Sequence, residues 1–182
     1  MRLFLYISIS FYFFISLLFA EETRQVDKHE HGVSELNIAI QSNTMVLEFM
    51  IPGADIVGFE YEAKSEQDKA TVNAALTKFD DYNNIFIIPT NSKCLLISSK
   101  ININQEDDHD DHDEHQEEAH NEFYAKYTFE CGDIKSLDLL EFPYFETFSN
   151  YGILEVQFVS EIGSTSFEVE ADSPIINIEG KI

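Results

Sequence analysis

Phe123-Tyr-Ala-Lys-Tyr-Thr-Phe-Glu-Cys131 is the stretch that decides the fold, because apolar and polar side chains alternate along it without a break. Alternate residues of a strand face the same side, so the pattern predicts a strand with one buried face. A second apolar run, Cys94-Leu-Leu-Ile-Ser-Ser-Lys-Ile-Asn-Ile103, also predicts a strand. If these two strands pair antiparallel, their far ends meet and Cys94 becomes the neighbour of Cys131.

The rest of the chain predicts further strands and one helix. Strands are expected at 33–40, 45–51, 152–160 and 165–171, the last two joined at Gly163-Ser164, with a short edge strand at 175–178. Ser65 and the acidic residues after it mark the start of a helix that ends at Asn83-Asn84. The segment 137–148 fits a helix or irregular structure. We therefore expect an α+β domain: a mostly antiparallel β-sheet with one or two helices on one face and a long disordered His/Asp-rich loop.

Residues 1–20 have the layout of a secretory signal. Met1-Arg2 is followed by an apolar run that closes at the small residue Ala20, and the acidic pair Glu21-Glu22 comes next. An uncleaved membrane anchor is the alternative, since the run is close to the ~20 residues that a span needs. Either way the sequence predicts one domain at 21–182 that is delivered outside the cytoplasm.

The chain has two cysteines, Cys94 and Cys131. In an oxidising compartment outside the cytoplasm, an even count of two predicts one disulfide. Thiolate ligation of a metal is the alternative interpretation. We expect the disulfide, which would join the base of a hairpin whose tip is the acidic tract described next.

Residues 105–122 read Gln-Glu-Asp-Asp-His-Asp-Asp-His-Asp-Glu-His-Gln-Glu-Glu-Ala-His-Asn-Glu, with ten acids, four histidines and no base. This acidic tract cannot fold by burial, because Ala119 is its only apolar residue. A solvated acidic spacer is the simplest interpretation of the acids alone. Imidazoles interleaved with carboxylates, however, match the ligands that zinc takes in proteins. The predicted zinc ligands in the tract are His109, His112, His115 and His120.

The other two histidines, His29 and His31, stand just before the first predicted strand. Alternate residues of an extended chain point to the same side, so they could chelate one ion as a pair. A plain polar lead-in to the strand is the alternative. Their spacing differs from that of the His-Glu-x-x-His zinc protease motif, whose histidines lie four apart on a helix.

Charge and motif content restrict the class of protein. The formal net charge of −23 repels nucleic acid and anionic membranes, and it favours cations or a basic protein surface as partners. Calcium is a rival ion, but the acidic tract lacks the regular spacing of an EF-hand loop. We find no nucleophile elbow, no phosphate-binding glycine loop and no helical metal-binding histidine pair, so we expect no enzyme.

Several of these segments resemble one family. His29-Glu-His31-Gly-Val-Ser-Glu-Leu-Asn-Ile-Ala-Ile resembles the His-x-His-Gly opening of the zinc-regulated periplasmic proteins, the ZrgA-like family. Ile51-Pro-Gly-Ala-Asp-Ile-Val-Gly-Phe-Glu60 is similar to that family's Pro-Ala-x-x-Leu-Val-Gly-Phe-Glu stretch. The likeness continues through a Cys before a His/Asp-rich insert, the strand Tyr124–Cys131 and a Phe-Pro pair at 142–143.

The resemblance covers nearly the whole chain after residue 20. It implies a periplasmic zinc-binding protein that acts with a zinc ABC importer, through that importer's binding protein or permease. It also supports His29, His31 and the histidines of the acidic tract as zinc ligands. The insert here has fewer histidines and more acids than is usual in the family. The alternatives are an acidic interaction module and a general divalent-cation buffer without a role in uptake.

Overall fold

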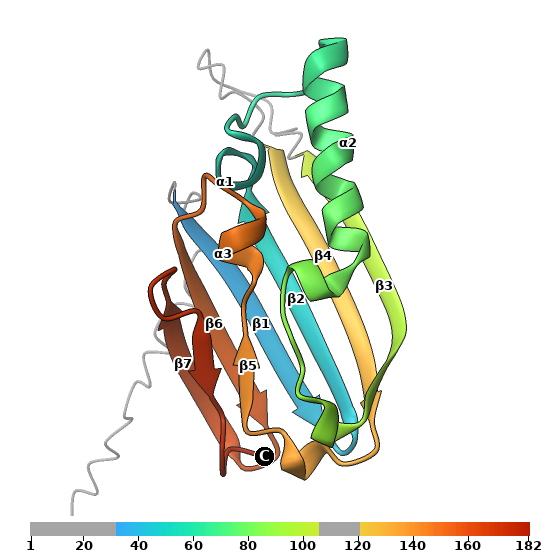
Figure 1. Ribbon diagram of the computed structural model, residues 1–182, viewed down its shortest axis with the longest axis vertical. Coiled ribbons are helices and arrows are strands. Elements are labelled where there is room, and N and C mark those ends of the chain that lie inside the picture. The colour runs from blue at the N-terminus through green and yellow to red at the C-terminus, as the bar shows by residue number, and fades with distance from the viewer. Residues whose placement is uncertain (1–31, 106–120) are drawn as a thin grey trace, which may run out of the picture.

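The protein is built around one six-stranded sheet (Figure 1). The computed structural model describes residues 32–105 and 121–182, and the predicted signal peptide at 1–20 lies outside them. The strand order is β3-β4-β2-β1-β6-β7. The strands are β1 (Val33–Gln41), β2 (Thr44–Pro52), β3 (Cys94–Gln105), β4 (Asn121–Cys131), β6 (Ile153–Ser160) and β7 (Gly163–Val169).

The sheet is mixed, because one of its pairings is parallel. The β1–β2, β2–β4, β3–β4 and β6–β7 pairs are antiparallel, whereas β1 pairs with β6 in parallel. The parallel pair arises because the chain returns to the starting end of β1 before β6 begins. Four of the five strand pairs in this sheet are therefore antiparallel, as expected, but the one parallel pair makes the sheet mixed.

Helices and a small second sheet cover one face of the main sheet (Figure 1). The long helix α2 (Glu66–Asp80) begins where it was predicted, and the Ser65 side chain accepts a hydrogen bond from the Asp68 amide at its start. The other covering elements are α1 (Gly53–Val57), α3 (Tyr144–Thr147), β5 (Leu139–Glu141), β8 (Ile175–Asn177) and three short 3₁₀ turns, η1 (Tyr82–Asn84), η2 (Thr90–Ser92) and η3 (Ile134–Ser136). Among the described residues, no helix has the length and apolar character needed to cross a membrane.

The core lies between the sheet and this cover. In β4 the buried and half-buried residues alternate, as the sequence predicted for 123–131. Tyr127 of β4 is fully buried, and its hydroxyl donates a hydrogen bond to the carbonyl oxygen of Phe79 in α2 at 2.6 Å. Burial raises the pKa of the Tyr127 phenol above its ordinary value, so the hydroxyl stays a donor. On the opposite face of the sheet, Glu35 and Glu155 are exposed.

Three local predictions need correction. The segment 137–148 is neither one helix nor irregular, because it contains β5 and α3. The strand at 175–177 pairs with β5 instead of forming an edge of the main sheet, which buries Leu140 and Ile176 against the core. The turn between β6 and β7 lies at 161–162, and Gly163 already pairs with Ser160.

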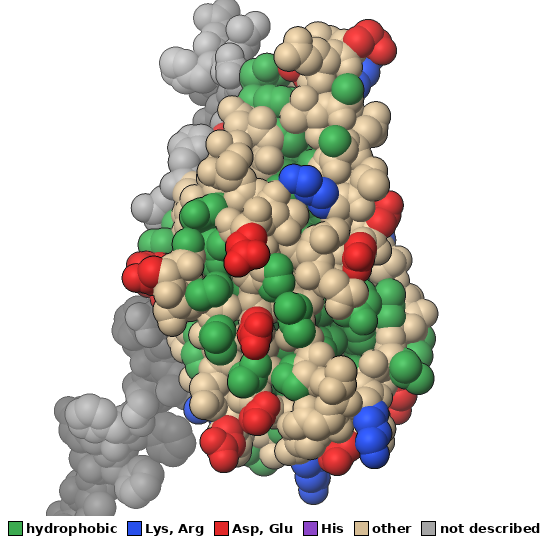
Figure 2. Space-filling view, viewed as in Figure 1, with side chains coloured by type: hydrophobic (Ala, Val, Ile, Leu, Met, Phe, Trp, Pro, Cys, Tyr) green, Lys and Arg blue, Asp and Glu red, His purple; other side chains and the backbone are tan. Residues whose placement is uncertain are grey.

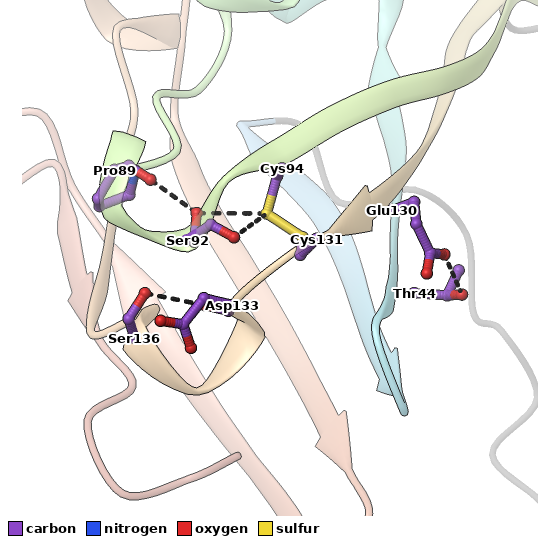
Figure 3. The surroundings of a disulfide bond; sticks show 8 residues. All are labelled: Thr44, Pro89, Ser92, Cys94, Glu130, Cys131, Asp133 and Ser136. Atoms are coloured by element: carbon purple, nitrogen blue, oxygen red, sulfur yellow. Dashed lines mark hydrogen bonds between the residues drawn. A yellow bond between two sulfur atoms is a disulfide. The ribbon is translucent and has the colours of Figure 1, made fainter.

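The disulfide between Cys94 and Cys131 is present, as predicted (Figure 3). The two cysteines are direct partners in the β3–β4 register, and their Cα atoms are 3.8 Å apart. Backbone hydrogen bonds continue past them, from Gly132 to Lys93 and from Asp133 to Ser92. The disulfide therefore joins two strand ends that backbone hydrogen bonds already hold together.

Candidate functional site

All six histidines lie outside the described residues, so the structure does not place the predicted ligands themselves. His29 and His31 precede Gly32, and the histidines at 109, 112, 115 and 120 fall within 106–120. Their role as zinc ligands stays a prediction. The described residues do show where each histidine-bearing segment joins the folded body, and which groups surround those two points.

The acidic tract leaves and re-enters the body at one point. Gln105, the last residue of β3, pairs directly with Asn121, the first residue of β4. Paired residues on neighbouring strands lie about 5 Å apart. The 106–120 segment therefore closes a hairpin, and both of its ends are fixed by the β3–β4 ladder.

The segment that carries His29 and His31 joins the body at Gly32. The carbonyl oxygen of Gly32 accepts a hydrogen bond from the Ile153 amide at 2.7 Å, which ties it to the start of β6. Gly152 packs against the same peptide so closely that a Cβ atom there would lie 1.8 Å from the Gly32 carbonyl oxygen. Gly32 has φ +84°, a conformation that glycine adopts without strain. The extended conformation of β1 therefore begins after Gly32, at Val33.

These two joining points lie at the same end of the sheet. β1 and β4 are the two neighbours of β2, and Met50 of β2 pairs with both Glu35 and Tyr124. Gly32 is three residues before Glu35 (35 − 32 = 3), and Asn121 is three residues before Tyr124 (124 − 121 = 3). Both therefore lie at the end of the sheet where β2 ends, with β2 between them. Figure 1 shows β1 and β4 starting at the same end, close to α1.

Asn121 holds the re-entry point of the acidic tract in place. Its amide donates to the carbonyl oxygen of Glu60 at 2.7 Å, and its side-chain Nδ2 donates to the carbonyl oxygen of Tyr61. Its own backbone crowds Gly53, where a Cβ atom would meet the Asn121 carbonyl oxygen at 2.9 Å. A hollow of about 240 Å³ adjoins this residue, and Glu62, Lys69, Asn73 and Ile103 are among the residues that line it.

A buried hydrogen-bonded chain of three polar side chains lies at the same end. Asp55 of α1 is 3% exposed, and it is the only buried charged residue among those that the structure describes. Ser34 of β1 donates its hydroxyl proton to Asp55 Oδ2 at 3.1 Å. The Tyr144 hydroxyl lies 3.1 Å from Ser34 Oγ. Because Ser34 has one proton and directs it to Asp55, Tyr144 is the donor in this second bond.

Burial raises the pKa of Tyr144 above its ordinary value, and the negative charge of Asp55 adds to this rise. The phenol therefore remains protonated and keeps donating. The chain of donors runs from Tyr144 to Ser34 to Asp55, and it fixes the direction of the Asp55 carboxylate. Sequence reasoning missed this cluster, although Asp55 is the one charged residue in the apolar run Ile51–Val57.

Within 32–105 and 121–182, no group of three or more His, Cys, Asp or Glu side chains is placed to hold a metal ion. Residues 28–178 match the family model described as ZrgA family zinc uptake protein. No curated protein matches the chain.

Proposed function

The chain belongs to the ZrgA family of zinc uptake proteins, and from this membership we propose that it is a periplasmic zinc-binding protein. It captures or buffers Zn²⁺ and supports uptake of the ion through a zinc ABC importer. It acts as a binding protein and not as an enzyme. The proposed ligands are the imidazoles of His29 and His31 and those of His109, His112, His115 and His120.

One observation carries this proposal: the two segments that contain every histidine join the folded body at the same end. Gly32 directly precedes β1 and Asn121 begins β4, and both lie at the end of the sheet where β2 ends. Histidine stands directly before each of them, at His31 and His120. Both segments can therefore reach a common ion, and a Zn²⁺ site needs ligands from only three or four side chains.

The charge of the protein supports capture of a cation. The formal net charge is −23, and the acidic tract contributes ten carboxylates without a base. Acidic side chains also occur across the helix-covered face, where few basic ones are seen (Figure 2). A field of this sign raises the local cation concentration and speeds association. Carboxylates also favour the protonated imidazole, so zinc affinity should fall as the pH drops through the histidine range.

An exported location fits the same proposal. A disulfide between Cys94 and Cys131 is compatible with an oxidising compartment such as the periplasm. Residues 1–20 have the sequence pattern of a signal peptide, and they lie outside the described residues. In the periplasm the receiver of the ion would be the binding protein or the permease of a zinc importer.

Zinc titration of the full mature chain tests this function. The chelator-free protein at neutral pH should bind more than one Zn²⁺. Replacing the four histidines of the acidic tract by Ala should remove most of that binding, and H29A/H31A should weaken the tightest site. The matched control is D107N/D108N/D110N/D111N, which changes four residues of the same tract, keeps its histidines and should retain zinc binding.

Two results would contradict the proposal. If the unsubstituted protein bound no Zn²⁺ in the titration, zinc capture could not be its function. An equal loss in the histidine and aspartate variants would show that the imidazoles contribute no more than the carboxylates, contrary to the proposed ligand set. Titration with copper and nickel in parallel would measure selectivity, which we expect to be modest because imidazole binds all three ions.

The ten acids of the acidic tract favour a second candidate, a general divalent-cation buffer or an acidic module that recruits a basic partner. Calcium binding equal to zinc binding would favour the buffer, because calcium prefers oxygen ligands. A growth assay in zinc-limited medium, with cells that lack the protein, distinguishes a cation buffer from a protein that supports zinc uptake. A growth defect that added zinc repairs supports uptake.

A further inference from the structure

The first half of the edge strand β3 is exposed and apolar. The strand order places β3 at one end of the sheet, where β4 is its neighbour on one side. Residues 95–100 are all exposed, whereas 101–103 are half-buried, and α2 lies over the other end of the strand (Figure 1). Leu95 is 71% exposed, Leu96 39% and Ile97 64%. A sheet edge that presents consecutive large apolar side chains is a typical site for pairing with another strand.

The same segment is the least acidic part of a strongly acidic chain. Residues 82–105 contain no Asp or Glu, the longest such stretch in the sequence, and they include Lys93 and Lys100. The formal net charge of −23 makes two copies repel each other over most of their surfaces. An approach along β3 brings together edges that carry no carboxylate of their own. The opposite edge strand, β7, exposes only glycine, serine and glutamate residues.

We propose that β3 is a dimerisation edge, at which β3 of a second copy of the chain pairs antiparallel to give one continuous sheet. Each copy offers the same strand, so the contact has two-fold symmetry and closes at two copies. Main-chain hydrogen bonds between the two strands hold the pair, and the neighbouring side chains fix its register. The inference is independent of the proposed zinc function.

The facing pattern of β3 fits this pairing in spite of its β-bulge. The ladder with β4 shifts between Leu96 and Ser98, so Ile97 is an extra residue. Bulges and lysines often keep sheet edges from pairing, but here a two-fold axis between Ile97 and Ser98 matches the faces on both sides of the bulge. The β4 partners of 95 and 100 are exposed or half-buried, and those of 94, 96, 99 and 101 are buried. Residue 95 then meets 100, 96 meets 99 and 94 meets 101, each pair on one face.

This register also brings opposite charges together across the interface. Glu130 of β4 pairs with Leu95, and the second copy's Lys100 lies on the other side of Leu95. The two charged residues are two strand spacings or about 10 Å apart, a gap that their side chains span. Within one copy Lys100 has Lys126 as its ladder partner, and none of the ion pairs among the described residues includes Lys100. The two-fold axis repeats the Lys100–Glu130 contact.

Sedimentation velocity of the full mature chain in EDTA tests the dimer. Concentrations should reach about 0.5 mM, because a small interface of this kind gives weak association. Salt at about 0.15 M screens the net charge of the two copies beyond about 8 Å. The expected result is a monomer–dimer equilibrium without larger species.

The decisive variant is I97E, which places a carboxylate from each copy beside the axis. It should raise the dissociation constant of the dimer at least about ten-fold, because like charges at an interface are strongly unfavourable. The matched control is I162E in the turn between β6 and β7, where Ile162 is 65% exposed against 64% for Ile97. It should leave the constant within about two-fold. If I97E does not fold, I97S removes the apolar contact without adding charge and should still weaken the dimer.

Charge reversal tests the register. K100E should weaken the dimer about five-fold, because it sets like charges against Glu130 at two contacts. K100E/E130K restores opposite charges and should return the dissociation constant to within about two-fold of the unsubstituted value. A structural role of Lys100 within one copy predicts no such rescue.

A protein that stays monomeric throughout this range overturns the proposal, and so does a dimer that I97E and I162E weaken equally. A dimer that forms with zinc and is absent in EDTA also overturns it, because the ion would then bridge the copies. If I97E dissociates the dimer but K100E/E130K does not restore what K100E loses, the dimerisation edge stands and the register is wrong.

Discussion

Removal of the Cys94–Cys131 disulfide should lower stability strongly and leave zinc affinity unchanged. The bond closes a chain separation of 37 residues. In the chain-entropy model a loop of this length contributes about 4 kcal/mol, because the crosslink restricts the unfolded chain. A domain of this size loses about 2–4 °C in Tm per kcal/mol, so the expected fall is roughly 8–16 °C. The fold should persist, since the backbone bonds from Gly132 and Asp133 hold the two strand ends without the bridge.

The measurement is urea unfolding in EDTA, followed by far-UV circular dichroism, for the oxidised protein and for C94A/C131A. Reduction of the native protein provides the matched comparison without a change of side chain. The slope of the unfolding free energy against urea should increase without the bridge, because the unfolded chain exposes more surface. A loss below about 1 kcal/mol in both experiments would refute the loop-closure reasoning.

Zinc affinity is the second half of this prediction. The disulfide lies at the opposite end of the 12-residue strand β3 from Gln105, which is roughly 35 Å at the rise of a strand. The candidate site and the bridge therefore share no contacts. If zinc binding fell together with stability in the folded C94A/C131A protein, the two ends of the hairpin would be coupled, contrary to this geometry.

Three further predictions concern the body. G152A should destabilise the fold by about 1–3 kcal/mol, because the new Cβ displaces the carbonyl group of Gly32. The same displacement should weaken the tightest zinc site. Thermal unfolding measures the first effect and zinc titration the second. Replacing 106–120 with Asn-Gly should give a folded protein of similar Tm, because the paired strand ends accept a two-residue turn. The hydrogen bond from Tyr124 holds the pKa of Glu48 below its ordinary value of 4.5, so Glu48 stabilises the fold above that pH and loses this effect as the pH falls through the lowered pKa. E48Q should therefore show a shallower acid loss of unfolding free energy in urea titrations between pH 6 and 3.

The sequence predicted the elements whose pattern is local. The structure contains the alternating strand at 123–131 and the serine cap at position 65. It also contains the antiparallel hairpin that brings the two cysteines together. In each case the signal depends on neighbouring residues or on one pairing, so it can be read without knowing the rest of the fold. The disulfide was predicted from the count of two cysteines in an exported chain, and the hairpin brings the two together, since Cys94 begins β3 and Cys131 ends β4.

The pairings set by distant packing could not be predicted in this way. Nothing in 33–40 or 152–160 shows that these strands lie side by side in parallel, since each alone reads as a half-buried strand. β5 is three residues long, and only its partner β8 makes it a strand. The burial of Asp55 was missed for the same reason. Its burial depends on Ser34 and Tyr144, which come from other parts of the chain.

The candidate site follows from sheet order more than from any motif. Because β1 and β4 flank β2 and run in the same direction, their first residues share one end of the sheet. That arrangement lets an ion bound by both histidine-bearing segments link Gly32 to Asn121. An ion held in this way would stabilise the body through RT ln(1 + [L]/Kd). An ion held by the acidic tract alone would leave the body unaffected, because a hairpin closed at Gln105 and Asn121 does not require the tract for its core. Zinc-linked stability of the β-sheet body therefore distinguishes a shared site from a site confined to the acidic tract.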